Sequence, residues 1–306
     1  PHRDSSNPFC NPLCSGVRME EILASRLTAI AGSALQRLNS VGGGCIADAS
    51  VAEFADGQRL FVKTAAGDHN MFMTEANSLR ELAGPGVIRV PEVVHAERSM
   101  LVLEVIDTSV PAGDFMAVFG RQLARLHRCS SGSFGFFEDN YIGATPQLNT
   151  PVRPMSDGWP AFYFEYRLLY QLRLAETNGH ATSELIDLFN VLESRVDGLL
   201  AGSEEPPALL HGDLWSGNYM VAADGAPCLI DPAVYYGHRE ADLGMTKLFG
   251  GFGRGFYEAY EDEFPQAAGA AEREGLYKLY HLLNHLNLFG SSYYGQCVAV
   301  LRHYCG

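Results

Sequence analysis

The hydrophobic pattern of this chain changes near residue 107, and that change limits the folds it can adopt. Before it, short runs rich in β-branched and aromatic residues, typical of strands, span 45–54, 59–63, 92–96 and 100–106. One helical pattern, 69–82, separates the second run from the third, and another, 19–38, precedes the first. We therefore expect an antiparallel sheet with one inserted helix over residues 19–106.

Helical spacing dominates after residue 107, which predicts a larger, mainly helical lobe over 107–306. The predicted helices span 114–128, 160–178, 183–200, 239–248 and 272–289. The whole is thus expected to be a two-lobed α+β fold, with nucleotide binding in the first lobe and catalysis in the second. Residues 1–18 are expected to lie outside this core, as an N-terminal extension or an expression remnant.

Charge and composition restrict the partners. The 306 residues include 36 acidic and 22 basic side chains, a formal charge of −14, which disfavours nucleic acid and anionic membrane surfaces. No stretch approaches the roughly 18 apolar residues of a membrane span, and no secretory signal is present, so we expect a cytoplasmic protein. The seven scattered cysteines predict reduced thiols rather than a disulfide framework.

One compact block between the predicted helices carries chemistry. Residues 209–232 read LLHGDLWSGNYMVAADGAPCLIDP. His211, Asp213 and Asn218 fit the H-x-D-x-x-x-x-N loop of kinases, in which the Asp meets the attacking hydroxyl and the Asn holds magnesium. Asp231 follows the apolar run 228–230, so its carboxylate is expected at a strand end, as a second ligand. One carboxylate and one amide oxygen suit Mg²⁺, which brings its own waters and the nucleotide phosphates.

The first lobe supplies the expected nucleotide contacts. Lys63 ends a strand, and it resembles the strand lysine of kinases that meets the α- and β-phosphates of ATP. Glu75 lies on the following helix, where it can pair with that lysine. The Gly-rich turn before the strands contains Gly43, Gly44 and Cys45, and its position predicts a phosphate-binding loop.

Three longer segments resemble the fructosamine kinases, a family within the aminoglycoside-phosphotransferase and protein-kinase-like fold. They are LLHGDLWSGN at 209–218, IDPAVYYGHREADLGMTKLFGGF at 230–252 and LYKLYHLLNHLNLFG at 276–290. The resemblance runs from about residue 19 to the C-terminus. It implies a protein-deglycation activity: ATP-dependent phosphorylation of the C3 hydroxyl of a ketosamine, which is a sugar joined to an amine.

The same resemblance implies a role for each matching residue. Asp213 is the base, Asn218 and Asp231 hold magnesium, Lys63 and Glu75 form the nucleotide ion pair, and Glu104, Val105 and Ile106 form the hinge facing adenine. This chain departs from the family in its phosphate loop. Many members have Gly-Gly-Ser-Ile-Asn where this chain has Gly-Gly-Cys-Ile-Ala at 43–47.

Aromatic residues near the catalytic block are candidate substrate contacts. Trp215 and Tyr235 offer flat faces to a sugar, and His285 is a further candidate on the last long helix; core packing is the alternative for each. The ammonium group of a ketosamine would favour an acidic cleft. Glu240 and Asp242 are interpreted as anchors of the catalytic loop, with Arg239 pairing with either.

Two alternatives remain open at this point. One is another small-molecule kinase of the same fold, for a choline-like or aminoglycoside acceptor, which is not expected to share DLWSGN or DPAVYYGHRE. The other is a nucleotide-binding pseudokinase, against which the intact Lys63, Asp213, Asn218 and Asp231 argue. Cys45 is a redox candidate, because a thiol in the phosphate loop can be oxidised reversibly. The sequence leaves the oligomeric state open, and we expect a monomer when the thiols are reduced.

Overall fold

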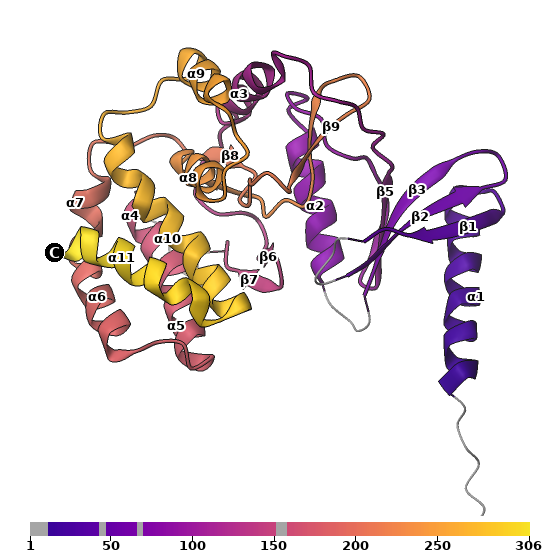
Figure 1. Cartoon of the computed structure of the whole chain (residues 1–306), viewed down its shortest axis with the longest axis horizontal. Helices are drawn as coiled ribbons and strands as arrows, with labels where there is room; N and C mark the ends of the chain where they lie inside the picture. Colours follow the sequence, from indigo (N-terminus) through magenta and orange to yellow (C-terminus); the bar gives the residue numbers. More distant parts are fainter. Residues whose placement is uncertain (1–11, 43–46, 66–69, 151–157) are drawn as a thin grey trace, which may run out of the picture.

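The computed structural model describes residues 12–42, 47–65, 70–150 and 158–306, with the backbone alone for 12–20. It has the two predicted lobes (Figure 1). The first lobe is an antiparallel sheet in the order β1-β2-β3-β5-β4. Its elements are α1 (Pro12–Ala31), β1 (Leu35–Ser40), β2 (Asp48–Phe54), β3 (Arg59–Thr64), α2 (Met71–Ala83), β4 (Val93–Glu97) and β5 (Met100–Glu104).

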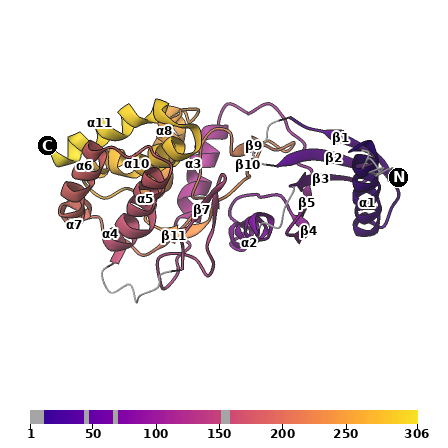
Figure 2. The ribbon, with the colours of Figure 1, turned by 90° about the horizontal axis from the view of Figure 1, so that it is seen from below.

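The two faces of this sheet are covered by the two helices (Figure 2). Val62 of β3 and Val102 of β5 share a core with Leu27 of α1. Leu103 of β5 instead joins the main core with Leu79 of α2. Because side chains alternate between the faces of a strand, position 63 lies on the α2 side. The alternation therefore puts Lys63, the predicted nucleotide-binding lysine, on the face of the sheet that α2 covers.

The start of the sheet differs from the prediction. The helical pattern expected over 19–38 ends at Ala31, and Leu35–Ser40 form the edge strand β1. Gly32 has a φ of 69°, in the left-handed region that favours glycine, and it ends the helix. Leu35 and Leu38 are three positions apart, which imitates helical spacing and explains the wrong prediction.

The second lobe is mainly helical, as predicted. Its helices are α3 (Phe115–Leu126), α4 (Gly158–Tyr163), α5 (Tyr170–Thr177), α6 (Ser183–Glu193), α7 (Val196–Leu200), α8 (Glu240–Leu248), α9 (Arg254–Glu263), α10 (Ala270–Phe289) and α11 (Tyr294–Cys305), with a π-helical segment at Phe164–Leu169 and a 3-10 turn at Ser291–Tyr293. Its short strands pair as β6 (Asn140–Ile142) with β7 (Thr145–Gln147), β8 (Ala208–Leu210) with β11 (Tyr235–Gly237), and β9 (Tyr219–Val221) with β10 (Pro227–Leu229). None of the helices in the described ranges is long and apolar enough to cross a bilayer.

Helix α2 belongs to the first lobe but is attached to the second. The amide of Asn77 donates to Glu138 at 2.8 Å, and the hydroxyl of Tyr236 donates to Glu81 at 2.7 Å. Glu138 lies just before the β6–β7 hairpin, and Tyr236 lies on β11. These contacts hold α2 between the sheet and the hairpin, where it forms one wall of the cleft between the lobes.

Candidate active site

The loop between β8 and β9 carries Asp213 and is fixed by close backbone contacts. Gly212 has a φ of 84°, and a Cβ at this position would lie 1.9 Å from the carbonyl oxygen of Ala233. The imidazole of His211 donates through Nε2 to Ile230 O at 2.9 Å, and Ala233 N donates to His211 O at 2.9 Å. The chain therefore needs glycine at 212 for the catalytic loop to lie against the strand end that carries Asp231.

Asp242, on α8, fixes the backbone of this loop by hydrogen bonds. Its carboxylate accepts hydrogen bonds from the backbone N of His211 at 2.7 Å and of Gly212 at 2.8 Å. Burial alone would raise the pKa of Asp242, but the hydrogen bonds from His127 and from the backbone amide of Gly212 help to lower it below its ordinary value. Asp242 is thus a buried carboxylate that orients the catalytic loop, as the sequence analysis expected.

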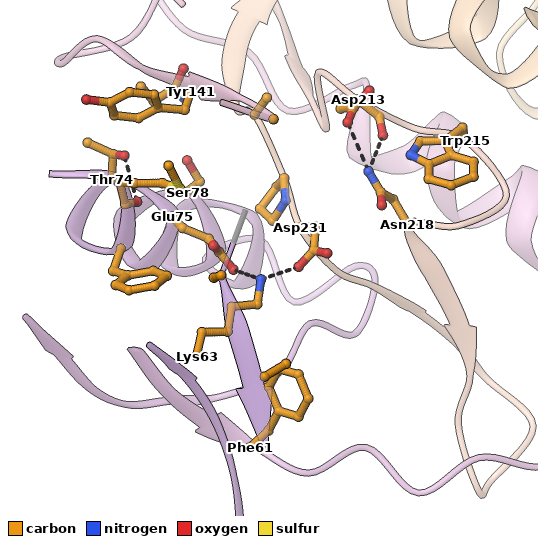
Figure 3. Close-up of a pocket in the computed structure, with 18 of the residues that line it drawn as sticks. Phe61, Lys63, Thr74, Glu75, Ser78, Tyr141, Asp213, Trp215, Asn218 and Asp231 are labelled. Atoms are coloured by element: carbon orange, nitrogen blue, oxygen red, sulfur yellow. Dashed lines mark hydrogen bonds and ion pairs between the residues drawn. The ribbon is translucent and has the colours of Figure 1, made fainter. Parts of the chain in front are cut away.

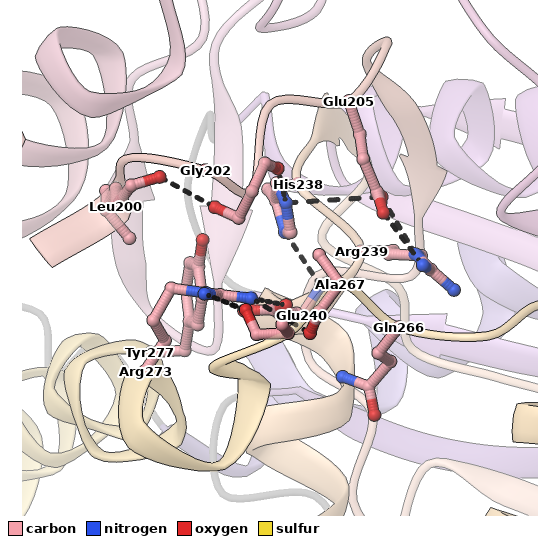
Figure 4. Close-up of polar contacts among 12 residues, drawn as sticks. Leu200, Gly202, Glu205, His238, Arg239, Glu240, Gln266, Ala267, Arg273 and Tyr277 are labelled. Carbon is pink, nitrogen blue, oxygen red and sulfur yellow. Dashed lines mark hydrogen bonds and ion pairs between the residues drawn. The ribbon is translucent and has the colours of Figure 1, made fainter.

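Glu240 and Arg239 have other partners than the sequence analysis proposed (Figure 4). Glu240 pairs with Arg273 of α10, with oxygen-to-nitrogen distances of 2.6 and 2.8 Å. Arg239 forms a two-point ion pair with Glu205 at 2.7 and 2.8 Å. These pairs hold α8, and they do not contact the catalytic loop.

Asp213 is a carboxylate in a largely dry setting, with 18% of its side chain exposed. Asn218 donates through Nδ2 to the backbone oxygen of Asp213 at 2.8 Å and to its Oδ2 at 3.1 Å. Burial raises the pKa of Asp213 to about 7; the bond from Asn218 opposes that shift, and the charges of Asp231 and Asp242 add to it. A carboxylate with a pKa near neutrality suits a general base.

Lys63 is the cation of the cleft and contacts two carboxylates. Its Nζ lies 2.7 Å from Glu75 Oε1 on α2 and 2.5 Å from Asp231 Oδ1 beyond β10. Burial would lower the pKa of Lys63, yet the two carboxylates raise it above its ordinary value, so the ammonium stays charged. Asp231 has a φ of 51°, and no other non-glycine residue in the described ranges has a positive φ. Backbone strain of this kind is common at functional sites, where it orients a side chain toward the site.

These side chains line one cavity of about 370 Å³ between the lobes. Figure 3 shows Lys63 between Glu75 and Asp231, with Asp213 and Asn218 beyond them. In the described part of the chain, no three His, Cys, Asp or Glu side chains form a metal cluster. The side-chain amide of Asn218 donates through its nitrogen, so its oxygen is available as a metal ligand. Asp231 can supply a carboxylate oxygen as a second ligand. This oxygen pair fits a hard cation that takes its other ligands from nucleotide and water.

Comparisons with known proteins agree with this geometry. The fructosamine kinase family matches residues 19–305. The chain belongs to this family. It is 42% identical over 275 residues to a Synechocystis protein named as a ketoamine kinase, with 88% of this chain and 90% of that protein covered. It is 41% identical over 278 residues to the chloroplastic protein-ribulosamine 3-kinase of Arabidopsis thaliana, with 88% and 83% covered.

Solved structures of other proteins share the fold of this fructosamine kinase family member. A Thermobifida fusca protein described as a fructosamine-3-kinase superposes with a TM-score of 0.82 at 36% identity, covering 92% of this chain and 98% of that one. More distant macrolide and aminoglycoside phosphotransferases, at 12–16% identity, share the fold alone. The predicted two-lobed, protein-kinase-like fold is therefore confirmed, as are kinase activity and membership of a family that phosphorylates ketosamines.

The structure brings some predicted substrate contacts of this family member to the cavity and leaves others outside. Trp215 lines the cavity with 38% of its surface exposed. Tyr235 does not, because only 1% of it is exposed and its ring packs against the guanidinium of Arg167 at 4.0 Å. His285 lies outside the cavity wall, but its ring is 4.8 Å from that of Phe249, which in turn lies 6.4 Å from Trp215.

The remaining predicted nucleotide contacts are not part of the described cavity wall. Gly43, Gly44 and Cys45 lie outside the described residues, so the phosphate-loop and redox predictions stay predictions. Glu104 is held by Arg89 at 2.5 Å, and Ile106 packs with Ala222 and Cys228. None of Glu104, Val105 and Ile106 is among the described residues that line the cavity.

Sequence reasoning missed one end of this cavity. Thr74 and Ser78 of α2 and Asn140 and Tyr141 of β6 line it together. No motif marks these residues, and the helix and the hairpin are more than 50 residues apart in the sequence, so only the folded chain brings them together.

Proposed function

We propose that the protein transfers the γ-phosphoryl group of ATP to the C3 hydroxyl of a ketosamine. The observation that carries this proposal is the single cavity in which a carboxylate with a pKa of about 7, Asp213, lies beside the charged Lys63 and the oxygen ligands Asn218 and Asp231. Phosphoryl transfer needs mainly positioning and charge neutralisation, which these groups provide.

Asp213 acts as the base in this proposal. Its Oδ1 accepts the proton of the C3 hydroxyl as the hydroxyl oxygen bonds to the γ-phosphorus, and Asn218 holds Oδ2. The bond between the γ-phosphorus and the β,γ-bridging oxygen breaks in the same step and releases ADP. Lys63 turns from Asp231 toward the nucleotide phosphates and keeps its bond to Glu75, which positions it. Mg²⁺, held by Asn218 and Asp231, would neutralise phosphate charge when bound.

The aromatic surface on the Trp215 side supports placing the acceptor there. Trp215, Phe249 and His285 form a row of rings, and Trp215 lines the cavity. An indole face binds the C–H face of a sugar or a cationic amine, and the carboxylates of Asp213 and Asp231 favour an ammonium group nearby. We therefore assign the amine end of the ketosamine to this row.

Asp231→Ala is expected to weaken nucleotide binding in a magnesium-dependent way, because it deletes a metal ligand. We expect the dissociation constant of ATP to rise by about 10-fold or more at millimolar magnesium, in line with the loss of a charged contact of roughly 1.5–3 kcal/mol. Calorimetry with and without magnesium measures this. Equal ATP affinity of the variant and the wild type at millimolar magnesium would contradict the role of Asp231.

An ADP-release screen tests the proposed function. The panel holds ketosamines of several sugars with one common amine, together with choline and an aminoglycoside as alternative acceptors. We expect acceptor-dependent ADP release with the ketosamines alone. Release with choline or the aminoglycoside would favour the alternative kinases, and magnesium-ATP binding without release would favour a pseudokinase.

The thiol chemistry supports a reducing location, and we propose the cytoplasm. Cys129, Cys228, Cys297 and Cys305 are all unpaired. Burial raises the pKa values of Cys228 and Cys297 to about 12, so these two thiols are inert. A monomer under reducing conditions remains our proposal, and light scattering with and without reductant tests it.

A further inference from the structure

The end of the cavity formed by α2 and β6 has an unexplained polar group. Ser78 is fully buried, and its Oγ has no hydrogen-bond partner among the residues that the structure describes. A serine inside a helix usually bonds a carbonyl of its own preceding turn, as Thr74 does with Met71 O at 3.0 Å. Ser78 instead lines the cavity. A buried hydroxyl without a partner is costly, which points to a ligand group that completes it.

The wall around Ser78 suits a neutral hydroxyl-bearing chain. Asn140 is already satisfied, because its nitrogen donates to Val234 O at 2.7 Å and its oxygen accepts from Gln147 and Asn149. Tyr141 faces α2 across the cavity (Figure 3). The charged groups that border this end, Glu75 and Lys63, are bound to each other at 2.7 Å. A charged ligand would therefore lack a counterion here, whereas a hydroxyl would satisfy Ser78.

The chemistry of a C3 kinase requires a second subsite in this direction. In a ketosamine the reacting C3 hydroxyl lies within the chain, with the amine on the C1 side and the remaining hydroxyls on the C4 side. When that hydroxyl meets Asp213, the two ends must extend to different parts of the cleft. Trp215 lies at one end of the lined cavity, and Tyr141 with Ser78 lies at the other (Figure 3).

We propose that Ser78 and Tyr141 form a subsite for the hydroxyl-bearing carbons of the ketosamine beyond C4. The Ser78 hydroxyl exchanges a hydrogen bond with a sugar hydroxyl, and the Tyr141 ring packs on the C–H groups of the chain. This subsite makes the enzyme sensitive to the length of the sugar. The inference rests on the proposed function.

Ser78→Ala tests the subsite, with three ketosamines that share one amine and carry sugars of four, five or six carbons. Alanine is the best helix former, so α2 is kept. We expect kcat/KM to fall about 3- to 10-fold for the five- and six-carbon acceptors, the loss of one neutral hydrogen bond, and to change less than about 2-fold for the four-carbon acceptor. Ser99→Ala is the control, because Ser99 lies in the β4–β5 turn and bonds Glu97.

The outcomes separate the two proposals. A wild type that phosphorylates no ketosamine overturns the proposed function and this inference with it. An active wild type whose Ser78→Ala variant loses activity equally on all three acceptors, or on none, overturns the subsite alone. A loss confined to the longer acceptors supports it.

Discussion

Asp213→Asn is expected to lower kcat by at least ~10²-fold, the range for losing a general base, and to make the protein more stable at the same time. Asparagine keeps the size of the side chain and an oxygen that can accept the bond from Asn218. It cannot take the hydroxyl proton. The ATP affinity is expected to stay within a few-fold of wild type, since Asp213 is not one of the proposed metal ligands. Initial rates and calorimetry measure both.

The gain in stability follows from the raised pKa. Burial raises the pKa of Asp213 from 3.8 to about 7, so the folded state binds its proton more tightly than the unfolded state. The wild type therefore loses stability as the pH rises between these two values, and the full penalty, about 2–4 kcal/mol, is present above pH ~7. Asparagine removes it.

Thermal unfolding of the metal-free proteins tests whether the variant is more stable than the wild type. The variant is expected to unfold several degrees above the wild type near pH ~8, and the difference is expected to shrink near pH ~5. A difference that does not change with pH would show that the carboxylate of Asp213 is not held in a low-dielectric site. Turnover close to that of the wild type would remove Asp213 from the mechanism.

Gly212→Ala is expected to abolish measurable turnover and to lower the free energy of unfolding by about 3 kcal/mol or more. The new Cβ would lie 1.9 Å from the backbone oxygen of Ala233, and the φ of 84° is itself unfavourable for alanine. The loop must move away from the strand end, which also breaks the bond from Gly212 N to Asp242. Denaturant unfolding and ADP release measure the two effects.

Gly225→Ala is the matched control for this substitution. Gly225 has a φ of 81° in the β9–β10 turn, and no atom lies within 4 Å of a Cβ built there. This variant carries the backbone penalty without the clash, so we expect about 1 kcal/mol of destabilisation and near-normal turnover. If both variants lose stability and turnover equally, the contact with Ala233 is not what fixes the catalytic loop.

The proposed catalytic residues could be located from the sequence because each stands at a fixed offset from an element end. Asp213 and Asn218 lie within one loop, and Asp231 follows β10, where the apolar run stops. Lys63 was placed by the strand pattern around it, and Glu75 by the helix that follows. Local spacing therefore carried most of the phosphate-transfer site.

The acceptor side of the cleft depends on packing and was predicted less well. Trp215 follows Asp213 in the sequence and Tyr235 follows Asp231, so both were candidate substrate contacts. Tyr235, however, pairs with Leu210 in the β8–β11 ladder, and its side chain is buried in the core. Ser78 and Tyr141 line one cavity, and the hydrogen bonds of Asn77 and Tyr236 attach α2 to the second lobe there. Such contacts between distant segments leave no periodic signal in one sequence.

The position of the new phosphate tests the central claim most directly. Wild-type protein, magnesium-ATP and a purified ketosamine are incubated, and the product is analysed by phosphorus–proton correlation NMR. We predict one phosphomonoester per ADP formed, coupled to the proton on C3 of the sugar. Phosphate on any other carbon, or ADP formed without a phosphorylated ketosamine, would contradict the assignment of Asp213 as the base for the C3 hydroxyl.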